Sequence, residues 1–499
     1  PMKPQDFTIL LPMLIVTVSG VILLLLDVFV PKTRNGINAF LAVVGLAIAF
    51  GFTLAQPAAA TLGFYDMVIA DSFSRYLNLL FIGAGIAGVL LAERYLHRMH
   101  IERGDYYPMM LFSVAGMLLM SISNDLIVVF LALELLSVPL YVLSSLGPLL
   151  NKSGEQVFRF IRRQSEEAAL KYFLLGTFST AFVVFGIALI FGASGSTNMV
   201  KIVQARYSIG FDSVLFLAGA GLLLVGFGFK MAAVPFHSWS PDVYQGAPSP
   251  VTSFMSVGAK AAGVAALVRV FFVLFQPLAA SLTPALYLVA ALTMIVGNLA
   301  ALSQTNIKRL LAYSSIAHGG YLLMAFVPFG KAAVSSDTVA SMLFYLVVYA
   351  LNSFGAWAVV IALEHIDKEG ERTRGLEIND YAGLAKKNIG LAIAMMVFML
   401  SFTGMPLTLG FWGKFYLFRT AVQGGFASLA LIGLLASVVS AYYYLRVVVV
   451  MFMHPGEPKI ERRQFAVTLV ALLAAAAVIV LSFFPSPLFE LAGRAFLGM

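Results

Sequence analysis

Apolar stretches long enough to cross a lipid bilayer recur along the whole chain, and they constrain its fold more than any other feature. About 20 consecutive apolar residues in a helix span the roughly 30 Å hydrocarbon core of a membrane. Hydrophobic residues make up 60% of the 499 positions and charged residues only 11%, too few for a chain that must keep a polar surface toward water. The sequence therefore predicts an all-α polytopic membrane protein.

The apolar windows predict fourteen transmembrane helices. Their approximate bounds are 7–30, 38–56, 74–96, 108–123, 125–149, 167–191, 210–234, 248–275, 280–303, 309–328, 337–364, 388–419, 425–452 and 464–492. We expect four parts: 1–107 with the N-terminal helices 1–3, 108–275 and 280–452 with five helices each, and 453–499 with helix 14.

The loops that follow odd-numbered spans carry most of the Lys and Arg, as in "RYLHRMHIERGD" and "NKSGEQVFRFIRRQ". Basic loops stay on the cytoplasmic side of a membrane. This rule predicts that both termini lie on the extracytoplasmic side. It also accounts for the net charge of +8 without a nucleic-acid partner.

The two five-helix parts resemble each other. Glu134 and His318, Lys230 and Lys414, and Lys260 and Tyr444 are each separated by the same offset of 184 residues. Tyr172 and Tyr345 align at an offset of 173 in a second matching stretch, "KYFLLGTFSTAFVVFGIALI" against "FYLVVYALNSFGAWAVVIAL". Because matching helices would run in opposite directions across the bilayer, we expect inverted-topology repeats, a recurrent plan of ion transporters.

Ionisable residues lie inside several predicted spans, where each charge costs about 2.5–3.5 kcal/mol even on the lenient insertion scale. The candidates for a proton relay are Glu134, Lys171, Lys230, Lys260, His318 and Lys414. Deep amines that share a cavity give up protons more readily than exposed ones. Two other interpretations stay open: the charges lock neighbouring helices together, and Lys171 extends its amine to the membrane surface.

Helices 7 and 12 are predicted to be broken beside two of these lysines. Pro235 and His237 follow Lys230, and Gly404, Pro406 and Gly410 precede Lys414. Interrupted helices are tolerated in a membrane where protein or water satisfies the freed backbone groups. The pattern therefore favours hydrated sites around both amines, with paired packing kinks as the alternative.

Several other chemistries are excluded or unsupported. The chain has no cysteine, so it cannot hold a disulfide or cysteine-ligated iron–sulfur clusters. The six histidines are scattered without metal-ligand spacing. "GFGFK" lacks the strand–turn–helix context of a dinucleotide-binding motif. We expect no cofactor and no metal on this chain.

The segments "FHSWSPDVYQGAPSPVTSFMSVGAK", "LALELLSVPLYVL", "IKRLLAYSSIAHGGYLLMA" and "GMPLTLGFWGKFYLF" resemble the antiporter-like membrane subunits of respiratory complex I. The resemblance extends over essentially all fourteen spans. Three features resemble the N type of this family rather than the L and M types. They are the motif "PDVYQGAPSPV", the lysine at position 414 in span 12, and the end of the chain after span 14.

The resemblance implies a proton-translocating subunit of a bacterial NADH:quinone oxidoreductase in the inner membrane. Glu134 would pair with Lys171 or another nearby charge, Lys230 would be the central amine, Lys260 and His318 would connect, and Lys414 would face the exit. His237, Asp242, Tyr321, Pro235 and Pro406 would support the relay.

The same resemblance implies membrane partners of the M, A, J and K types and contact with lipid. NADH, FMN, the iron–sulfur clusters and quinone would belong to partner subunits. Two other functions stay open from the residues alone: a subunit of a multi-chain cation/proton antiporter, and a structural membrane scaffold.

Overall fold

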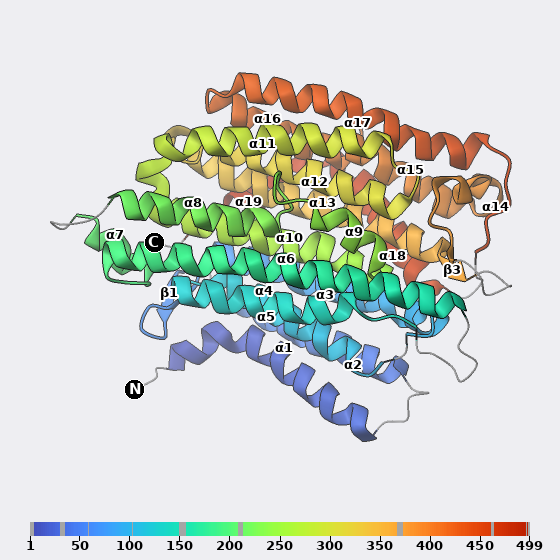
Figure 1. Cartoon of the computed structure of the whole chain (residues 1–499), viewed down its shortest axis with the longest axis horizontal. Coiled ribbons are helices and arrows are strands. Elements are labelled where there is room, and N and C mark those ends of the chain that lie inside the picture. The colour runs from blue at the N-terminus through green and yellow to red at the C-terminus, as the bar shows by residue number, and fades with distance from the viewer. Residues whose placement is uncertain are drawn as a thin grey trace.

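The computed structural model describes residues 4–29, 35–57, 59–101, 103–148, 156–207, 213–366, 373–460, 464–495 and 497. These residues are helical almost throughout (Figure 1). Two short antiparallel hairpins join helices: β1 (Thr61–Gly63) with β2 (Val68–Ala70), and β3 (His365–Ile366) with β4 (Thr373–Arg374).

Each predicted span corresponds to one helix or to two short ones. The helices of the first three spans are α1 (Pro4–Phe29), α2 (Asn35–Ala55) and α3 (Ser72–Arg98). Spans 4–8 are α4 (Tyr106–Ile122), α5 (Leu126–Ser144), α6 (Gln156–Ser194), α8 (Ser213–Lys230) with α9 (Trp239–Gly246), and α10 (Ser249–Val270). A short helix, α7 (Met199–Ala205), follows α6, and a π-helical turn (Phe271–Phe275) and a 3-10 turn (Gln276–Leu278) follow α10.

Spans 9–14 are α11 (Ala279–Leu302), α12 (Ile307–Phe326), α13 (Ser335–Leu363), α15 (Ile389–Thr403) with α16 (Leu409–Gln423), α17 (Ala427–Met453) and α18 (Phe465–Phe483). Between them lie 3-10 turns at Ala332–Val334 and Ile378–Tyr381 and the short α14 (Leu384–Lys387), and α19 (Pro485–Gly493) ends the described helices. Among the described residues, ten helical segments are long and apolar enough to cross a membrane; one of them, Ser249–Leu302, contains two of the predicted spans, and Tyr106–Ile122 and Ile389–Thr403 are shorter apolar helices.

The two five-helix parts pack alike. α4 lies along α5 and α10, and α11 lies along α12 and α17. α6 packs on α8 in the first part, and α13 packs on α15 and α16 in the second. The same neighbours therefore recur at matching positions of the two parts.

Both predicted breaks are present. α8 ends at Lys230, and eight residues separate it from α9. α15 ends at Thr403 and is capped by Gly404, whose φ of 87° is a left-handed conformation that glycine adopts without steric cost. Gly410 does not break the helix: it lies inside α16, where its missing side chain lets the backbone approach the carbonyl oxygen of Ser401.

α6 begins at Gln156, well before the predicted start at 167. The added turns are rich in helix-forming residues. Ion pairs one turn apart support them, from Arg162 to Glu166 at 2.7 Å and from Lys171 to Glu167 at 2.8 Å. The helix therefore continues beyond its apolar part into the polar end of the bundle.

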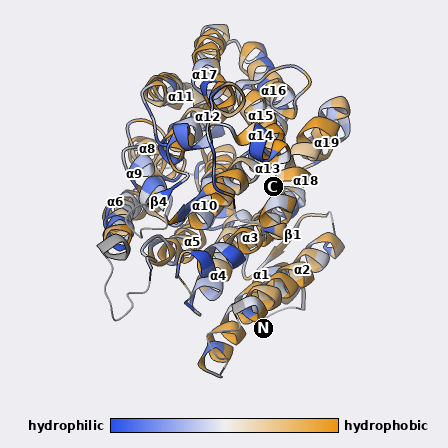
Figure 2. Ribbon diagram, turned by 90° about the vertical axis from the view of Figure 1, so that its right-hand side faces the viewer, coloured by the Kyte–Doolittle hydropathy of each residue, from blue (hydrophilic) through white to orange (hydrophobic). Residues whose placement is uncertain are grey.

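Figures 1 and 2 show the two ends of the bundle. The marks for both termini lie toward one end of the molecule in Figure 1, with α7 and β1, and the hairpin β3–β4 and α14 lie at the opposite end. Figure 2 looks at that opposite end and shows hydrophilic residues there, with hydrophobic residues along α1, α2 and α19. Parts of the predicted basic loops, at 31–34, 149–155, 367–372 and 461–463, lie outside the described residues.

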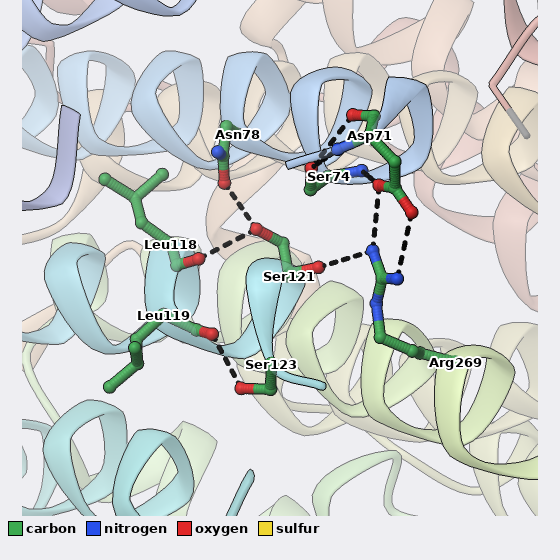
Figure 3. Close-up of polar contacts among 8 residues, drawn as sticks. All are labelled: Asp71, Ser74, Asn78, Leu118, Leu119, Ser121, Ser123 and Arg269. Carbon is green, nitrogen blue, oxygen red and sulfur yellow. Dashed lines mark hydrogen bonds and ion pairs between the residues drawn. The ribbon is translucent and has the colours of Figure 1, made fainter. Parts of the chain in front are cut away.

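A buried ion pair ties the N-terminal helices to the first repeat (Figure 3). The guanidinium of Arg269 donates to both carboxylate oxygens of Asp71 at 2.9 Å and to the carbonyl oxygen of Ser121 at 2.8 Å. Asp71 also caps α3 by accepting from the backbone N–H of Ser74 at 2.8 Å. This cluster therefore joins α3, α4 and α10 at one end of the bundle.

Candidate functional site

Lys230 occupies the last position of α8, at the break, and is 4% exposed. Its amine donates to the hydroxyl of Ser137 on α5 at 2.7 Å. The rings of Tyr141 and Tyr172 lie 5.6 and 5.7 Å from the amine nitrogen, at cation–π distance. The ring of Phe229 lies at a similar distance, 5.6 Å, and the Ser137 hydroxyl itself donates to the carbonyl oxygen of Leu133. The amine is thus held by a neutral hydroxyl and by aromatic faces rather than by a carboxylate.

Glu134 lies one turn before Ser137 on α5 and is partly exposed. Its carboxylate accepts from the hydroxyl of Thr180 on α6 at 2.8 Å and interacts electrostatically with Lys230. The implied pair of Glu134 with Lys171 is not formed, because Lys171 binds other carboxylates. Glu134 acts instead on Lys230, a neighbouring charge.

Lys260 lies in the middle of α10 and is 2% exposed. Its amine donates to the hydroxyl of Ser315 on α12 at 2.5 Å and to the carbonyl oxygen of the same residue. The amines of Lys230 and Lys260 therefore bind different helices, α5 in the first case and α12 in the second. Lys260 connects the first repeat to the second.

His318 lies on α12, one turn after Ser314 and Ser315, and is 3% exposed. Its Nδ1 is hydrogen-bonded to the hydroxyl of Tyr345 and its Nε2 to the hydroxyl of Tyr444 at 3.2 Å. Both ring nitrogens thus face groups that can accept and donate a proton. This arrangement suits a relay and also the alternative of a core histidine satisfied by hydroxyls.

Lys414 lies on α16 after the second break and is 5% exposed. Its amine donates to the hydroxyl of Ser437 at 2.6 Å and to the carbonyl oxygen of Thr403 at 2.9 Å. The amine nitrogen lies 4.8 Å from the centre of the Tyr321 ring. The setting repeats that of Lys230: a buried amine, a serine hydroxyl and an aromatic face beside a helix break.

Lys171 lies in an open polar cluster at the bundle end. Its amine pairs with Asp242 at 2.7 Å and Glu167 at 2.8 Å, and its side chain is 42% exposed. Arg309 donates to the other oxygen of Asp242 at 2.7 Å. Burial alone raises the pKa of Asp242, but the hydrogen bonds from Lys171 and Arg309 outweigh it and hold that pKa below its ordinary value.

A small pocket of about 120 Å³ opens beside this cluster, and Lys171, Glu167, Asp242 and Gln245 are among its lining residues. The cluster therefore faces water at the end of the bundle rather than the relay inside. This position agrees with the interpretation that Lys171 extends its amine to the membrane surface.

The supporting residues divide into two groups. Pro235 and Pro406 are exposed within the breaks. His237 is partly buried, and Tyr321 is buried, with its hydroxyl accepting from the amide of Asn298 at 3.4 Å. Tyr321 contacts Lys414, whereas His237 and Asp242 lie in and after the loop that follows Lys230.

Sequence reasoning found the buried charges but missed the hydroxyls that hold them. These are Ser137, Ser315, Tyr345, Tyr444 and Ser437. The sequence repeats point only to Tyr345 and Tyr444 among them, as the counterparts of Tyr172 and Lys260. Serines and tyrosines are common in transmembrane helices, so nothing in their spacing singled them out as partners.

The buried groups follow one another from repeat to repeat as Glu134, Lys230, Lys260, His318 and Lys414. Both Lys260 and Lys414 interact electrostatically with His318. Within the described residues, no group of three or more His, Asp or Glu side chains forms a possible metal site. The chemistry these residues offer is proton transfer among amines, an imidazole and hydroxyls.

Comparisons with known proteins agree with this arrangement. Residues 123–440 match the family described as NADH:quinone oxidoreductase/Mrp antiporter. The chain is 42% identical to NADH-quinone oxidoreductase subunit N of Trichlorobacter lovleyi, over 98% of this chain and 97% of that one. It is also 42% identical to subunit N of Chloroflexus aggregans, with the same coverage.

Solved structures show the same fold. A chain of respiratory complex I from Thermus thermophilus with bound Aureothin is 34% identical, with a TM-score of 0.80 and coverage of 97% of this chain and 99% of that one. A chain of the Mrp complex from Dietzia matches with a TM-score of 0.82, coverage of 99% and 97%, and 18% identity, which supports the fold alone.

The fold and the buried amines at two helix breaks define an antiporter-like membrane protein. Within that class, the chain belongs to the family of NADH-quinone oxidoreductase N subunits.

Proposed function

We propose that this chain is a proton-translocating subunit in the membrane arm of a bacterial NADH-quinone oxidoreductase. The observation that carries the proposal is the series of buried amines at two helix breaks. Lys230, Lys260 and Lys414 each bind a serine hydroxyl, and His318 lies between the last two. A protein that needed these charges for packing alone would pair them with carboxylates, as it pairs Arg269 with Asp71.

The relay would work through the charge on Glu134. A carboxylate stabilises the ammonium form of a nearby amine. When Glu134 interacts with Lys230, the amine keeps its proton. When a competing positive charge pairs with the Glu134 carboxylate, Lys230 loses its counter-charge and releases its proton toward Lys260. His318 and Lys414 then carry the proton through the second repeat.

The partial exposure of Glu134 supports this role, since a partner subunit can reach its charge from outside the chain.

NADH oxidation, FMN, the iron–sulfur clusters and quinone reduction would belong to partner subunits. Within the membrane we propose contacts with subunits of the M, A, J and K types. The basic end of the bundle, with β3, β4 and α14, would face the cytoplasm, and both termini would face outward.

Replacement of Lys230 by Ala tests the function. The variant is introduced into the assembled complex, and NADH-driven proton uptake and quinone reduction are measured in inverted membrane vesicles. We expect proton uptake to fall by at least about tenfold, because a positioned acid–base group contributes a factor of 100 or more.

Lys201→Ala is the matched control, since Lys201 is an exposed lysine of α7 at the opposite end of the bundle from α14. It should pump normally. Normal proton uptake and quinone reduction in the assembled Lys230→Ala complex would rule the proposed relay out.

A further inference from the structure

A second buried acid lies outside the relay described above. Glu364 follows directly after α13 and is 3% exposed. Its carboxylate accepts from the hydroxyl of Tyr95 at 3.1 Å and from the hydroxyl of Ser249. The amine of Lys308, 2% exposed, interacts with it electrostatically and donates to the carbonyl oxygen of Ala247 at 2.7 Å. Glu364 therefore joins α3, α10 and α13 at the basic end of the bundle.

Ser249 begins a polar face of α10 that leads to the relay. Ser249, Ser253, Ser256 and Lys260 are spaced by four, three and four residues, so they lie on one side of the helix. All four are at most 2% exposed. At 1.5 Å per residue this face extends about 16 Å along α10, from Ser249 to Lys260.

The hydroxyl of Ser253 is buried without a hydrogen-bond partner among the described residues. An unpaired buried hydroxyl is costly, so most buried hydroxyls are bonded. A hydroxyl that is not bound to a carbonyl oxygen can turn to accept a proton on one side and donate its own on the other. A single bridging water can connect hydroxyls one helical turn apart.

Beyond Ser253 the hydroxyls are connected to the relay. The hydroxyl of Ser256 donates to the carbonyl oxygen of Ser253 at 2.8 Å and is also hydrogen-bonded to the hydroxyl of Ser353 on α13 at 2.9 Å. Tyr349, one turn from Ser353, interacts with both Ser256 and Ser353. The hydroxyl of Tyr349 donates to Ser315 at 2.8 Å. Ser315 is the residue that binds the amine of Lys260.

At its other side Glu364 lies next to an open polar pocket of about 320 Å³. Leu363 and His365, on either side of Glu364, line this pocket with Arg374 and Asp380. Glu364 itself does not line the pocket, but both of its chain neighbours do, and its carboxylate is hydrogen-bonded to the first of the buried hydroxyls, that of Ser249.

We propose that Glu364 is a proton-entry residue, which passes protons from the pocket at the basic end along the serine face of α10 to Lys260. The carboxylate takes a proton from hydronium in the pocket, which leaves water, and gives that proton to Ser249. Each hydroxyl accepts one proton and donates its own, the neutral amine of Lys260 receives the last one, and Glu364 returns to the carboxylate. This inference rests on the proposed function.

The competing explanation is structural: Glu364 anchors three helix ends through Tyr95 and Ser249. Two variants separate the explanations. Glu364→Gln keeps an acceptor for Tyr95 and a polar partner for Ser249 but cannot carry a proton. Ser253→Ala removes a hydroxyl that makes no described hydrogen bond, so a structural role predicts no loss.

Ser113→Ala is the matched control, because Ser113 is equally buried but its hydroxyl donates to the carbonyl oxygen of Leu136 on another pair of helices. All variants are measured in the assembled complex in inverted membrane vesicles, by NADH-driven proton uptake at equal rates of NADH oxidation. We expect Glu364→Gln to reduce proton uptake by at least about tenfold. Ser253→Ala should reduce it several-fold, and Ser113→Ala should leave it unchanged.

Normal proton uptake in an assembled Glu364→Gln complex would overturn the entry role. If that variant fails to assemble, normal uptake in Ser253→Ala overturns it instead. Lys230→Ala is measured alongside. Loss of pumping in Lys230→Ala with normal pumping in Glu364→Gln and Ser253→Ala would reject the entry residue and leave the proposed function standing. Normal pumping in Lys230→Ala would reject the function itself.

Discussion

Replacing Asp71 with Ala should destabilise the chain strongly through the buried ion pair of Figure 3. Asp71 and Arg269 each have a side chain only 2% exposed, and two hydrogen bonds of 2.9 Å join them. Without Asp71 the guanidinium stays buried without its counter-charge, which costs about 3–5 kcal/mol. Loss of the cap on α3 adds about 1 kcal/mol. We expect a total of roughly 4–6 kcal/mol.

The free energy of unfolding is measured by denaturant titration of the purified chain in mixed detergent micelles. Ser74→Ala is the control, because it removes the returning hydrogen bond of the cap and leaves the ion pair intact. That variant should lose about 1 kcal/mol. A cost for Asp71→Ala no larger than that for Ser74→Ala would refute the reasoning.

Two further predictions concern the second helix break and the surface cluster. Gly410→Ala places a Cβ 1.9 Å from the carbonyl oxygen of Ser401, so α15 and α16 must separate, at a cost of about 1–3 kcal/mol in the free energy of unfolding. Gly390→Ala is the control: its Cβ would lie 3.5 Å from the nearest atom, so the same unfolding titration should show almost no change. Because Lys171 and Arg309 lower the pKa of Asp242, its ion pairs contribute fully at neutral pH and are lost only as the pH falls through that lowered pKa, below about 3.9. Proton pumping between pH 6 and 8.5 should therefore show the same pH dependence in Asp242→Asn as in the wild type, and a shifted profile would contradict this assignment.

The sequence predicted much of the site because the free-energy cost of placing a helix in a bilayer depends mainly on the residues of that helix alone. A lysine at the centre of an apolar span is visible in the sequence, and Lys230, Lys260 and Lys414 are all buried in the structure. The breaks beside Lys230 and Lys414 were predictable for the same reason, since proline and glycine act on their own helix.

Other features depended on contacts between distant segments and were not predictable. Lys171 was expected near Glu134 but binds Asp242, because α6 continues beyond the apolar part and carries this residue to the polar bundle end. Arg269 lies in an apolar stretch as plainly as the lysines, yet its partner Asp71 is 198 positions away in the chain. No local pattern connects the two.

By itself, the sequence determined the class of protein, the order of its helices, the positions of both helix breaks and the identity of the deep charges. Each of these depends on the cost of placing a given segment in a bilayer. The tertiary structure alone decided which hydroxyl holds which amine, that Lys260 reaches the second repeat through Ser315, and that Glu364 meets the serine face of α10. Those contacts arise because packing brings side chains from separate helices within hydrogen-bonding distance, and hydropathy contains no information about such pairs.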